Sequence, residues 1–276
     1  MAIITISRGC FSKGKEVAEK VADALGYECI SREVLLEASE HFNIPEIKLE
    51  RALHDSPSIL QRFTYGKERY LAYITAAFLE RVHQGNVVYH GLAGQFLLRG
   101  VSHVLKVRIL ADMKDRVALE MKDDKSLSRK EAVARLLKDD EERRQWSQHL
   151  FGEDTWNPGL YDLVLHIHKL NVQNAADMIC MAARLEQFQE TSESQMVLDN
   201  LVLAARVRAG LVGDYPMVQT HADNGIVTVD ARFNMTTEPA LAEKIKEKAQ
   251  QIPGVKEVRM HALSVSAYLH CDTCEE

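Results

Sequence analysis

Long apolar runs, aromatic residues and cysteines are all scarce in this chain of 276 residues. No stretch approaches the roughly 18 uninterrupted apolar residues that a membrane-spanning helix needs, so we expect no membrane span. The opening residues, MAIITISR, contain no cationic segment followed by a long apolar one, so we expect no signal peptide. Aromatic residues make up only 7% of the chain, which disfavours an all-β sandwich.

Disulfide bonds and a strongly basic surface are also not expected. Five cysteines, an odd number spread over the whole chain, are typical of a reduced cytoplasmic protein. Lys and Arg number 34 against 40 Asp and Glu, which gives a formal net charge of −6. A nucleic-acid polymer is therefore not an expected partner, whereas a local cationic pocket for a small phosphate ligand is compatible with this balance.

Short β-branched runs alternate with longer helical patterns in the first part of the chain. Apolar residues recur at helical spacing between these runs, as at Val17, Val21 and Leu25. This alternation favours an α/β fold with a mostly parallel sheet that is covered by helices on both faces. The expected strands are residues 3–6, 27–30, 86–90, 104–110 and 162–167.

Two segments between these strands are too long for simple crossovers. Residues 31–85 are expected to be helical throughout, with one apolar stripe made of Tyr70, Ile74, Phe78 and Val82. Residues 111–160 are highly charged, and most such charge runs are simply the solvated face of a helix.

The pattern changes after the polar stretch 187–195, which is typical of a linker. Asn224-Gly225 between two alternating runs predicts a β-hairpin. The expected elements after the linker are a helix near 196–209, strands near 217–221 and 226–233, a helix over 239–251 and a strand near 255–263. The predicted organisation is a first domain over residues 1–188, a linker over 189–196 and a small α+β domain over 197–276.

The sharpest motif follows the first expected strand, where Gly9, Gly14 and Lys15 have the G-x-x-x-x-G-K spacing of a phosphate-binding loop. Glycines let backbone N–H groups converge on phosphate oxygens, and the next helix contributes the positive end of its dipole. Glu16 stands where a Ser or Thr would hold magnesium, and a carboxylate there repels phosphate unless a cation intervenes or the side chain turns away. A strand-to-helix turn without a ligand is the alternative interpretation.

Several stretches occur together with this loop in a characteristic order. They are Ile4-Thr5-Ile6-Ser7-Arg8, Gly14-Lys15-Glu16-Val17-Ala18, Ser31-Arg32-Glu33-Val34, Asp140-Glu141-Glu142-Arg143 and Trp156-Asn157-Pro158-Gly159-Leu160-Tyr161-Asp162-Leu163-Val164. In this order they resemble the cytidylate kinase-like family, a branch of the P-loop nucleoside monophosphate kinases. The resemblance covers about residues 1–188, and a Glu at the Glu16 position is usual in that family.

The resemblance implies a P-loop kinase-like fold with a five-stranded parallel sheet, in which 31–85 supplies the monophosphate-binding helices and 111–160 the lid. Its implied cofactors are ATP and Mg²⁺, bound by Gly9, Ser12, Lys13, Gly14, Lys15 and Glu16. The implied catalytic cations are Lys15, Arg135 and Arg143, and the implied substrate-binding residues are Arg32 and Arg144. Phosphoryl transfer needs mainly positioning and charge neutralisation, which such cations supply. Exposed ion pairs with Asp139 or Glu142 are the structural alternative for the lid arginines.

Departures from the family pattern keep more than one function open. Leu92 stands where the family usually has an arginine, Ser31 replaces the usual aspartate, and Cys10, Phe11 and Lys13 occupy loop positions where small residues are common. One hypothesis is an enzyme that transfers phosphate from ATP to a pyrimidine nucleoside monophosphate. The alternatives are a degenerate nucleotide-binding regulatory protein and a purely structural partner protein, and a homodimer is not excluded for any of them.

The C-terminal module carries a second resemblance. Asp223-Asn224-Gly225-Ile226-Val227-Thr228-Val229 and Ile252-Pro253-Gly254-Val255-Lys256-Glu257-Val258 are similar to stretches of BON-like domains, over about residues 197–265. This resemblance implies binding of an unidentified ligand without catalysis.

Two further groups of residues are not expected to carry chemistry. Cys271 and Cys274 form one C-x-x-C without a second cysteine pair, and although His261 and His270 could contribute ligands, a frayed acidic tail without a metal site is the favoured interpretation. His166 and His168 share one strand face and are expected to be core or edge residues.

Overall fold

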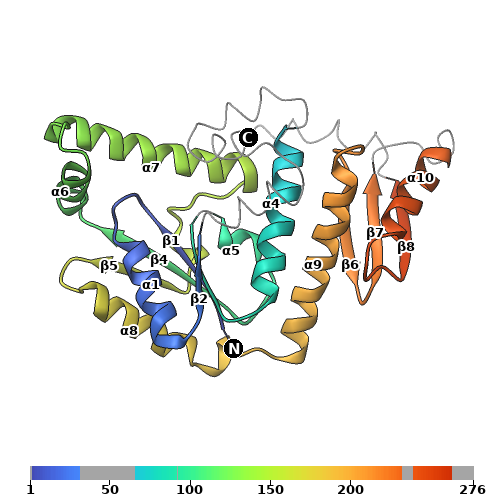
Figure 1. Ribbon diagram of the computed structural model, residues 1–276, viewed down its shortest axis with the longest axis horizontal. Helices are drawn as coiled ribbons and strands as arrows, with labels where there is room; N and C mark the ends of the chain where they lie inside the picture. Colours follow the sequence, from blue (N-terminus) through green and yellow to red (C-terminus); the bar gives the residue numbers. More distant parts are fainter. Residues whose placement is uncertain (1, 32–65, 92, 232–238, 263–276) are drawn as a thin grey trace, which may run out of the picture.

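The computed structural model describes residues 2–31, 66–91, 93–231 and 239–262. Figure 1 shows two sheets, a larger one flanked by helices and a smaller one at the opposite end from the charged helices. Arg32 and Leu92, which the sequence analysis singled out, lie outside the described residues, as do Cys271 and Cys274. None of the described helices combines the length and apolarity that crossing a membrane requires.

The larger sheet has five strands, all parallel, in the order β2-β3-β1-β4-β5. They are β1 (Ile3–Arg8), β2 (Glu28–Ile30), β3 (Val87–His90), β4 (Val104–Ala111) and β5 (Leu163–Ile167). Ile6 of the central strand lies opposite His90 on one side and Val107 on the other. The parallel α/β sheet predicted from the sequence is therefore confirmed, and the loop after β1 opens at the middle of its carboxyl edge.

Helices cover both faces of this sheet. On one face, α1 (Gly14–Leu25) and α8 (Val172–Ala183) share a core with β1, β3, β4 and β5. On the other face, α4 (Gly66–His83), the short α5 (Gly94–Leu97) and α9 (Ser192–Val212) lie close to the sheet (Figure 1). The predicted stripe of Tyr70, Ile74, Phe78 and Val82 is buried on α4. Residues 32–65 of the segment expected to be helical lie outside the described residues.

The charged segment folds into two helices, α6 (Met113–Asp123) and α7 (Arg129–Phe151). A capping box starts α7, because Ser128 Oγ accepts a hydrogen bond from the Glu131 N–H and Glu131 Oε2 accepts one from the Ser128 N–H. Val117, Ala132 and Leu136 form a small apolar core between the two helices. The segment, which we call the lid, therefore has its own core beneath its charged surface.

Glu120 is a buried carboxylate of the lid, only 2% exposed. Its Oε1 lies 3.2 Å from Arg135 Nε, whereas its Oε2 has no hydrogen-bond partner in the described part of the chain. Burial raises the pKa of Glu120 although Arg135 opposes the shift. The folded protein therefore retains a proton that the unfolded chain has lost, and this group's contribution to stability falls as pH rises from about 4.3 through the raised pKa.

Glu120→Gln is expected to remove this dependence, so that the free energy of unfolding at neutral pH is equal to or above that of the wild type and its pH profile is flatter. Urea denaturation at mildly acidic and neutral pH measures both quantities. Glu131→Gln is the matched control, and its pH effect has the opposite sign. Hydrogen bonds from Ser128 lower the pKa of Glu131, so the contribution of Glu131 to the free energy of unfolding is lost as pH falls. If the free energy of unfolding of the Glu120→Gln protein changes with pH as it does in the wild type, Glu120 is not the source of this pH dependence.

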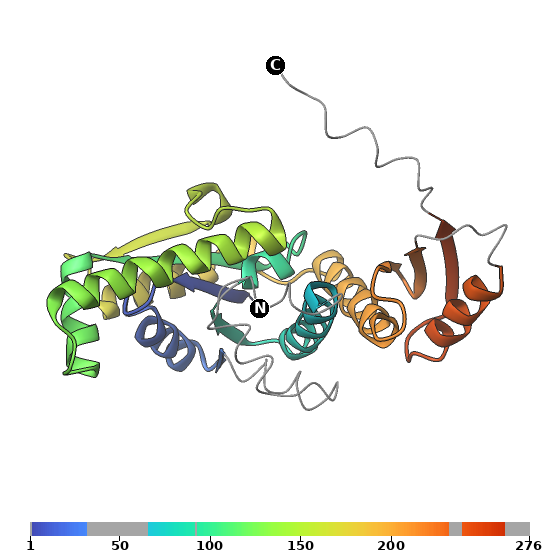
Figure 2. The same ribbon diagram turned by 90° about the horizontal axis from the view of Figure 1, so that it is seen from above.

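The smaller sheet has three strands, β6 (Gln219–Asp223), β7 (Ile226–Ala231) and β8 (Glu257–Ala262). The predicted hairpin is confirmed, since β6 and β7 are antiparallel and Asn224 and Gly225 both have positive φ, 51° and 90°. β8 joins β7 in parallel after α10 (Pro239–Gln250). Figure 2 shows this sheet at one end of the molecule and the lid helices at the other.

One helix, α9, belongs to the cores of both sheets. Its Leu198 and Val202 pack with α4 and the larger sheet, whereas Val207 and Leu211 pack with the smaller sheet. The helix begins at Ser192, four residues before the expected Met196, because Thr191 and Ser194 form a capping box. Residues 192–196, expected in the linker, are therefore the first turn of a packed helix.

Candidate functional site

The loop Gly9–Lys13 joins β1 to α1 at the carboxyl edge of the larger sheet. Phe11 and Lys13 take left-handed backbone conformations, with φ of 52° and 63°, and the buried Ser12 donates a hydrogen bond from Oγ to the Gly9 carbonyl at 2.9 Å. Lys13 is the N-cap of α1, and no side chain caps this helix. The first N–H groups of α1 are therefore available to an anion at the positive end of the helix dipole.

Gly14 is required by the path of the Arg8 side chain. A Cβ atom added at Gly14 would lie 2.7 Å from Arg8 Cβ and 2.6 Å from Arg8 Cδ. These distances are shorter than any ordinary carbon–carbon contact, and Arg8 Cβ is fixed by the strand that carries it. The motif glycine thus lets an arginine of β1 cross the start of α1.

Gly14→Ala is expected to lower the free energy of unfolding by about 1–3 kcal/mol, the usual cost of forcing extra atoms into a packed site. Urea denaturation measures this change. Gly213→Ala is the control, because Gly213 has helical backbone angles of −59° and −46° and the nearest atom to its added Cβ is 3.7 Å away. If the Gly14→Ala and Gly213→Ala proteins are equally stable, the path of the Arg8 side chain does not require a glycine at position 14.

Two arginines at the loop are near enough for the charge of one to act on the other. Arg8 Nε is buried and has no hydrogen-bond partner among the residues that the structure describes. Burial, and then the positive charge of Arg143 on α7, lower the pKa of Arg8. The charge of Arg143 also acts on Cys10 of the loop, where it opposes the burial that raises the pKa of that thiol. Two like charges in a partly buried place are costly, and an anion between them would remove that cost.

Arg116 fastens the lid to the loop. Its Nη1 and Nη2 donate to the two carboxylate oxygens of Asp140 at 2.7 and 2.8 Å, and its Nε donates to the Cys10 carbonyl at 2.8 Å. Arg116 is 7% exposed and the Asp140 side chain 17%. Cys10 and Phe11 pack against the apolar core of the lid. The bulky loop residues, which depart from the family pattern, are thus part of the contact between loop and lid.

Lys15 and Glu16 are both exposed, and within the described residues neither pairs with Arg116 or Asp140. The Lys15 side chain is 64% exposed, and its Nζ lies 3.7 Å from Glu19 Oε1 one turn along α1. Glu16 is exposed on the same helix. A pocket of about 500 Å³ between the loop, α1 and α6 is lined by Arg8, Lys13, Lys15 and Lys122, with Glu16 and Asp123 also on its wall. Lys15 therefore has no structural partner beyond Glu19 in the described chain and borders an open cationic pocket.

The structure brings only some of the sequence-predicted residues together. Arg143 lies near the loop, whereas Arg135 pairs with Glu120 of α6 and with Asp124, the C-cap of that helix. Arg144 is held by Asp154, and its Cζ lies 5.1 Å from the centre of the exposed Trp156 ring. Asp154 raises the pKa of Arg144 through this hydrogen bonding.

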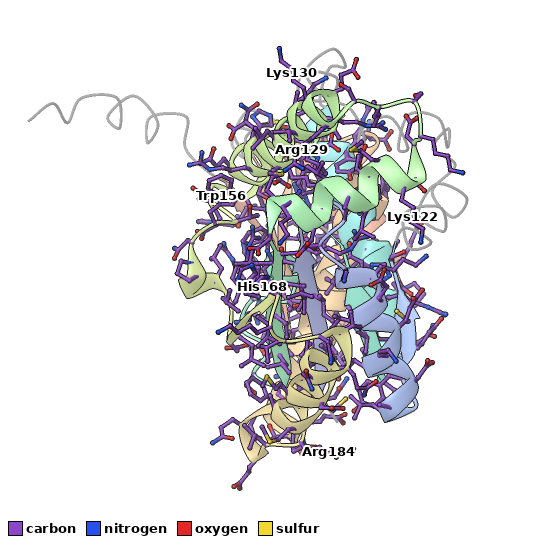
Figure 3. All side chains as sticks on the ribbon, turned by 90° about the vertical axis from the view of Figure 1, so that its left-hand side faces the viewer. Lys122, Arg129, Lys130, Trp156, His168 and Arg184 are labelled. Carbon is purple, nitrogen blue, oxygen red and sulfur yellow. The ribbon has the colours of Figure 1, made fainter. Side chains whose placement is uncertain are left out.

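The sequence analysis missed Arg8, Arg108, Arg116 and the partner role of Asp140. Arg108 of β4 donates from Nη1 to Ser7 Oγ at 3.3 Å and to Tyr161 Oη at 3.2 Å. A second pocket, of about 370 Å³, lies beside the loop and is lined by Gly9, Ser12, Arg108, Arg116, Asp140 and Trp156. Figure 3 faces the lid end and labels Trp156 and Lys122 on that side. Two motif stretches, Ile4-Thr5-Ile6-Ser7-Arg8 and Asp140-Glu141-Glu142-Arg143, contained Arg8 and Asp140, whereas no motif contained Arg108 or Arg116.

The 2-3-1-4-5 order of parallel strands, the glycine-containing loop after β1 and the two-helix lid define a protein of the P-loop kinase-like α/β class. The model of the cytidylate kinase-like family matches residues 3–169, more than half of the chain. The chain belongs to this family. No curated protein matches it closely enough to show a relationship.

Comparison with solved structures finds matches to the larger part of the chain, of which the first has a TM-score above 0.5. An uncharacterized protein from Eubacterium ventriosum is 20% identical, with a TM-score of 0.51, and the match covers 66% of this chain and 98% of that one. Shikimate kinase from Bacteroides thetaiotaomicron is 10% identical, with a TM-score of 0.43 over 67% of this chain and 99% of that one. TT1252 from Thermus thermophilus is 17% identical, with a TM-score of 0.44 over 67% and 97%.

Proposed function

We propose that this protein binds ATP with Mg²⁺ at the loop after β1 and transfers the terminal phosphoryl group to a nucleoside monophosphate, with a pyrimidine base as the first candidate. Membership of the cytidylate kinase-like family supports nucleotide-dependent phosphoryl transfer in general. The observation that carries the proposal is Arg8, which lines the cationic pocket at the loop and whose buried Nε has no hydrogen-bond partner among the described residues. The positive charge of Arg143 also acts on Arg8. A polyphosphate between them is the simplest compensating anion.

The residues present fit a triphosphate. The uncapped start of α1 offers backbone N–H groups, and Lys15 is free to swing towards a terminal phosphate. Mg²⁺ prefers oxygen ligands and keeps several waters, and Glu16 is the oxygen donor that stands at the position of the usual hydroxyl. Bound with ATP, Mg²⁺ would neutralise part of the phosphate charge.

The lid would contribute a cation to the site and exclude water from it. Arg143 brings a second cation to the loop from α7, and lid closure excludes water that would otherwise hydrolyse ATP. Arg135 is paired with Glu120, and Arg144 with Asp154. To bind phosphate oxygens in the proposed reaction, each arginine must leave its carboxylate partner. Arg32 completes the proposed substrate contacts.

A nucleotide-binding regulatory protein without turnover is the second candidate. The observation that favours it is the attachment of the lid to the loop through Arg116, Asp140 and the Cys10 carbonyl. A lid held in this way resists the opening that substrate entry and product release require. Nucleotide binding and turnover are therefore separate questions for this chain.

The C-terminal part is included in the proposal as a BON-like binding domain over residues 197–276, which shares the helix α9 with the core of the larger sheet. Its support is the order of strand, helix and strand around the two motif stretches, formed by β7, α10 and β8. We further assign the protein to the cytoplasm, since Cys10 and Cys180 form no disulfide bond within the described residues. A homodimer is compatible with this assignment.

The test is a thermal-shift panel of nucleotides, followed by coupled detection of ADP with each monophosphate. Stabilisation by ATP–Mg²⁺ together with ADP formation on CMP or dCMP supports the kinase. Stabilisation by ATP–Mg²⁺ without ADP above background for any monophosphate supports the regulatory protein. If the panel shows no stabilisation by ATP–Mg²⁺ and no ADP formation, the kinase and the regulatory protein are both overturned. A purely structural partner protein then remains.

A further inference from the structure

Two aspartates and two histidines gather where the lid joins the larger sheet, and phosphoryl transfer makes no use of them. Asp112 follows β4 as the N-cap of α6, and Asp115 lies in the first turn of that helix. His166 belongs to β5, and His168 follows its last residue. β4 and β5 pair in parallel, with Leu110 opposite His166, so both segments end at the same edge of the sheet.

Asp112 is held between the two imidazoles. Its Oδ1 lies 3.0 Å from His166 Nε2 and its Oδ2 lies 2.9 Å from His168 Nδ1. The two rings are stacked, with centres 6.1 Å apart and planes inclined by 24°. An aspartate at an N-cap normally accepts hydrogen bonds from its own helix, but Asp112 makes no such bond. Both its oxygens are therefore directed to the histidines instead of the helix.

We propose that Asp112, Asp115 and His168 form a binding site for a divalent transition-metal ion of the Zn²⁺ type, with His166 orienting Asp112 from outside. One ligand atom from each of the three residues lies within 4.8 Å of the others. Ligands bound at about 2.0–2.2 Å in a tetrahedral site lie about 3.3–3.6 Å from one another, so modest side-chain movements suffice. Imidazole with carboxylate suits Zn²⁺, whereas Mg²⁺ prefers oxygen alone.

The proposed metal site borders a pocket on one side and connects the lid to the sheet on the other. Asp115 and His168 line a pocket of about 360 Å³ that Phe11 and Lys13 of the phosphate loop also border. A fourth ligand from this pocket, water or an oxygen of a bound molecule, would complete the coordination. The ion would also join the first turn of α6 to the end of β5, and so fix the point at which the lid leaves the sheet. Figure 3 labels His168 on this side of the molecule.

The chain contains a matched control on the smaller sheet. Asp230 lies between His221, at 3.4 Å, and His261, at 2.9 Å. Within the described ranges, however, Asp112, Asp115 and His168 are the one group of three potential ligands whose ligand atoms converge this closely, and the group around Asp230 does not. His261→Ala therefore removes an aspartate-bound histidine without touching the proposed ligands.

The test is titration of the full chain with Zn²⁺ by calorimetry and with Co²⁺ by absorption spectroscopy. We expect one site with a Co²⁺ spectrum of oxygen and nitrogen ligands, unaffected by His261→Ala. His166→Ala is expected to weaken binding about 10–100-fold as an outer partner, and His168→Ala and Asp115→Asn at least as much. Excess Mg²⁺ is expected not to displace the ion.

Several results would overturn the site. They are unchanged affinity in both His168→Ala and Asp115→Asn, displacement by Mg²⁺, or a thiolate charge-transfer band that disappears in a Cys271→Ser/Cys274→Ser variant. The melting temperature of each variant without metal shows whether the variant folds. If the His168→Ala protein does not fold, the near-isosteric Asp115→Asn variant still tests the site. Nucleotide binding is measured separately, so failure of this site leaves the proposed function untouched.

Discussion

Replacing Lys15 by alanine is expected to lower ADP formation by about 10²–10³-fold, the usual cost of removing one preorganised group that stabilises developing charge. The side chain is 64% exposed and contacts only Glu19 among the described residues, at 3.7 Å, so its loss should not change the melting temperature. Coupled ADP detection with ATP and the best monophosphate measures the effect.

Lys20→Ala is the matched control, because Lys20 is also exposed on α1 but lies beyond its first turn. It should retain wild-type activity. Equal rates for the Lys15→Ala and Lys20→Ala proteins would contradict the role of Lys15. If the wild type itself makes no ADP, the same pair of variants is compared for the thermal shift produced by ATP–Mg²⁺.

Replacing Arg116 by alanine is expected to lower the free energy of unfolding by about 3–5 kcal/mol, the cost of removing one member of a buried ion pair. Asp140, 17% exposed, would retain its charge without its bidentate partner, and the Cys10 carbonyl would lose its hydrogen bond. Urea denaturation measures this change. The apolar double variant Arg116→Met/Asp140→Leu should recover much of the loss, because no buried charge is left unpaired.

Lys138→Ala serves as the control on the same lid. Its pair with Glu142 spans 3.7 Å between side chains that are 74% and 26% exposed. Such pairs contribute about 0–1 kcal/mol, so this variant should be near wild type. A loss below about 1 kcal/mol in Arg116→Ala would show that the contact between lid and loop is not a stabilising one.

The local features of the fold were predictable from the sequence. Parallel strands buried on both faces appear as short β-branched runs, and all five were found near their expected positions. The Asn224-Gly225 turn identified the hairpin because few other pairs tolerate positive φ at both positions. The start of α9 was misplaced because its first turn is polar, and Thr191 and Ser194 serve there as capping residues.

The contacts between distant segments were not predictable. Arg116 meets Cys10 across 106 positions of the chain, and nothing in its own surroundings distinguishes it from other arginines of a charged lid. The same limit applies to Arg135, Arg143 and Arg144, since only the packing of α7 decides which of them is near the loop. His166 and His168 were expected to be structural because Asp112 becomes their neighbour only through the register of β4 and β5.

The central claim is that the loop between Gly9 and Lys15, with Arg8 and Arg143, captures a polyphosphate. Calorimetric titration of the wild type and of an Arg143→Ala variant with ATP–Mg²⁺ and with inorganic tripolyphosphate tests it most directly. We predict saturable binding of both ligands to one site in the wild type, and clearly weaker binding of both in the variant. A folded wild-type protein that binds neither ligand would contradict the claim.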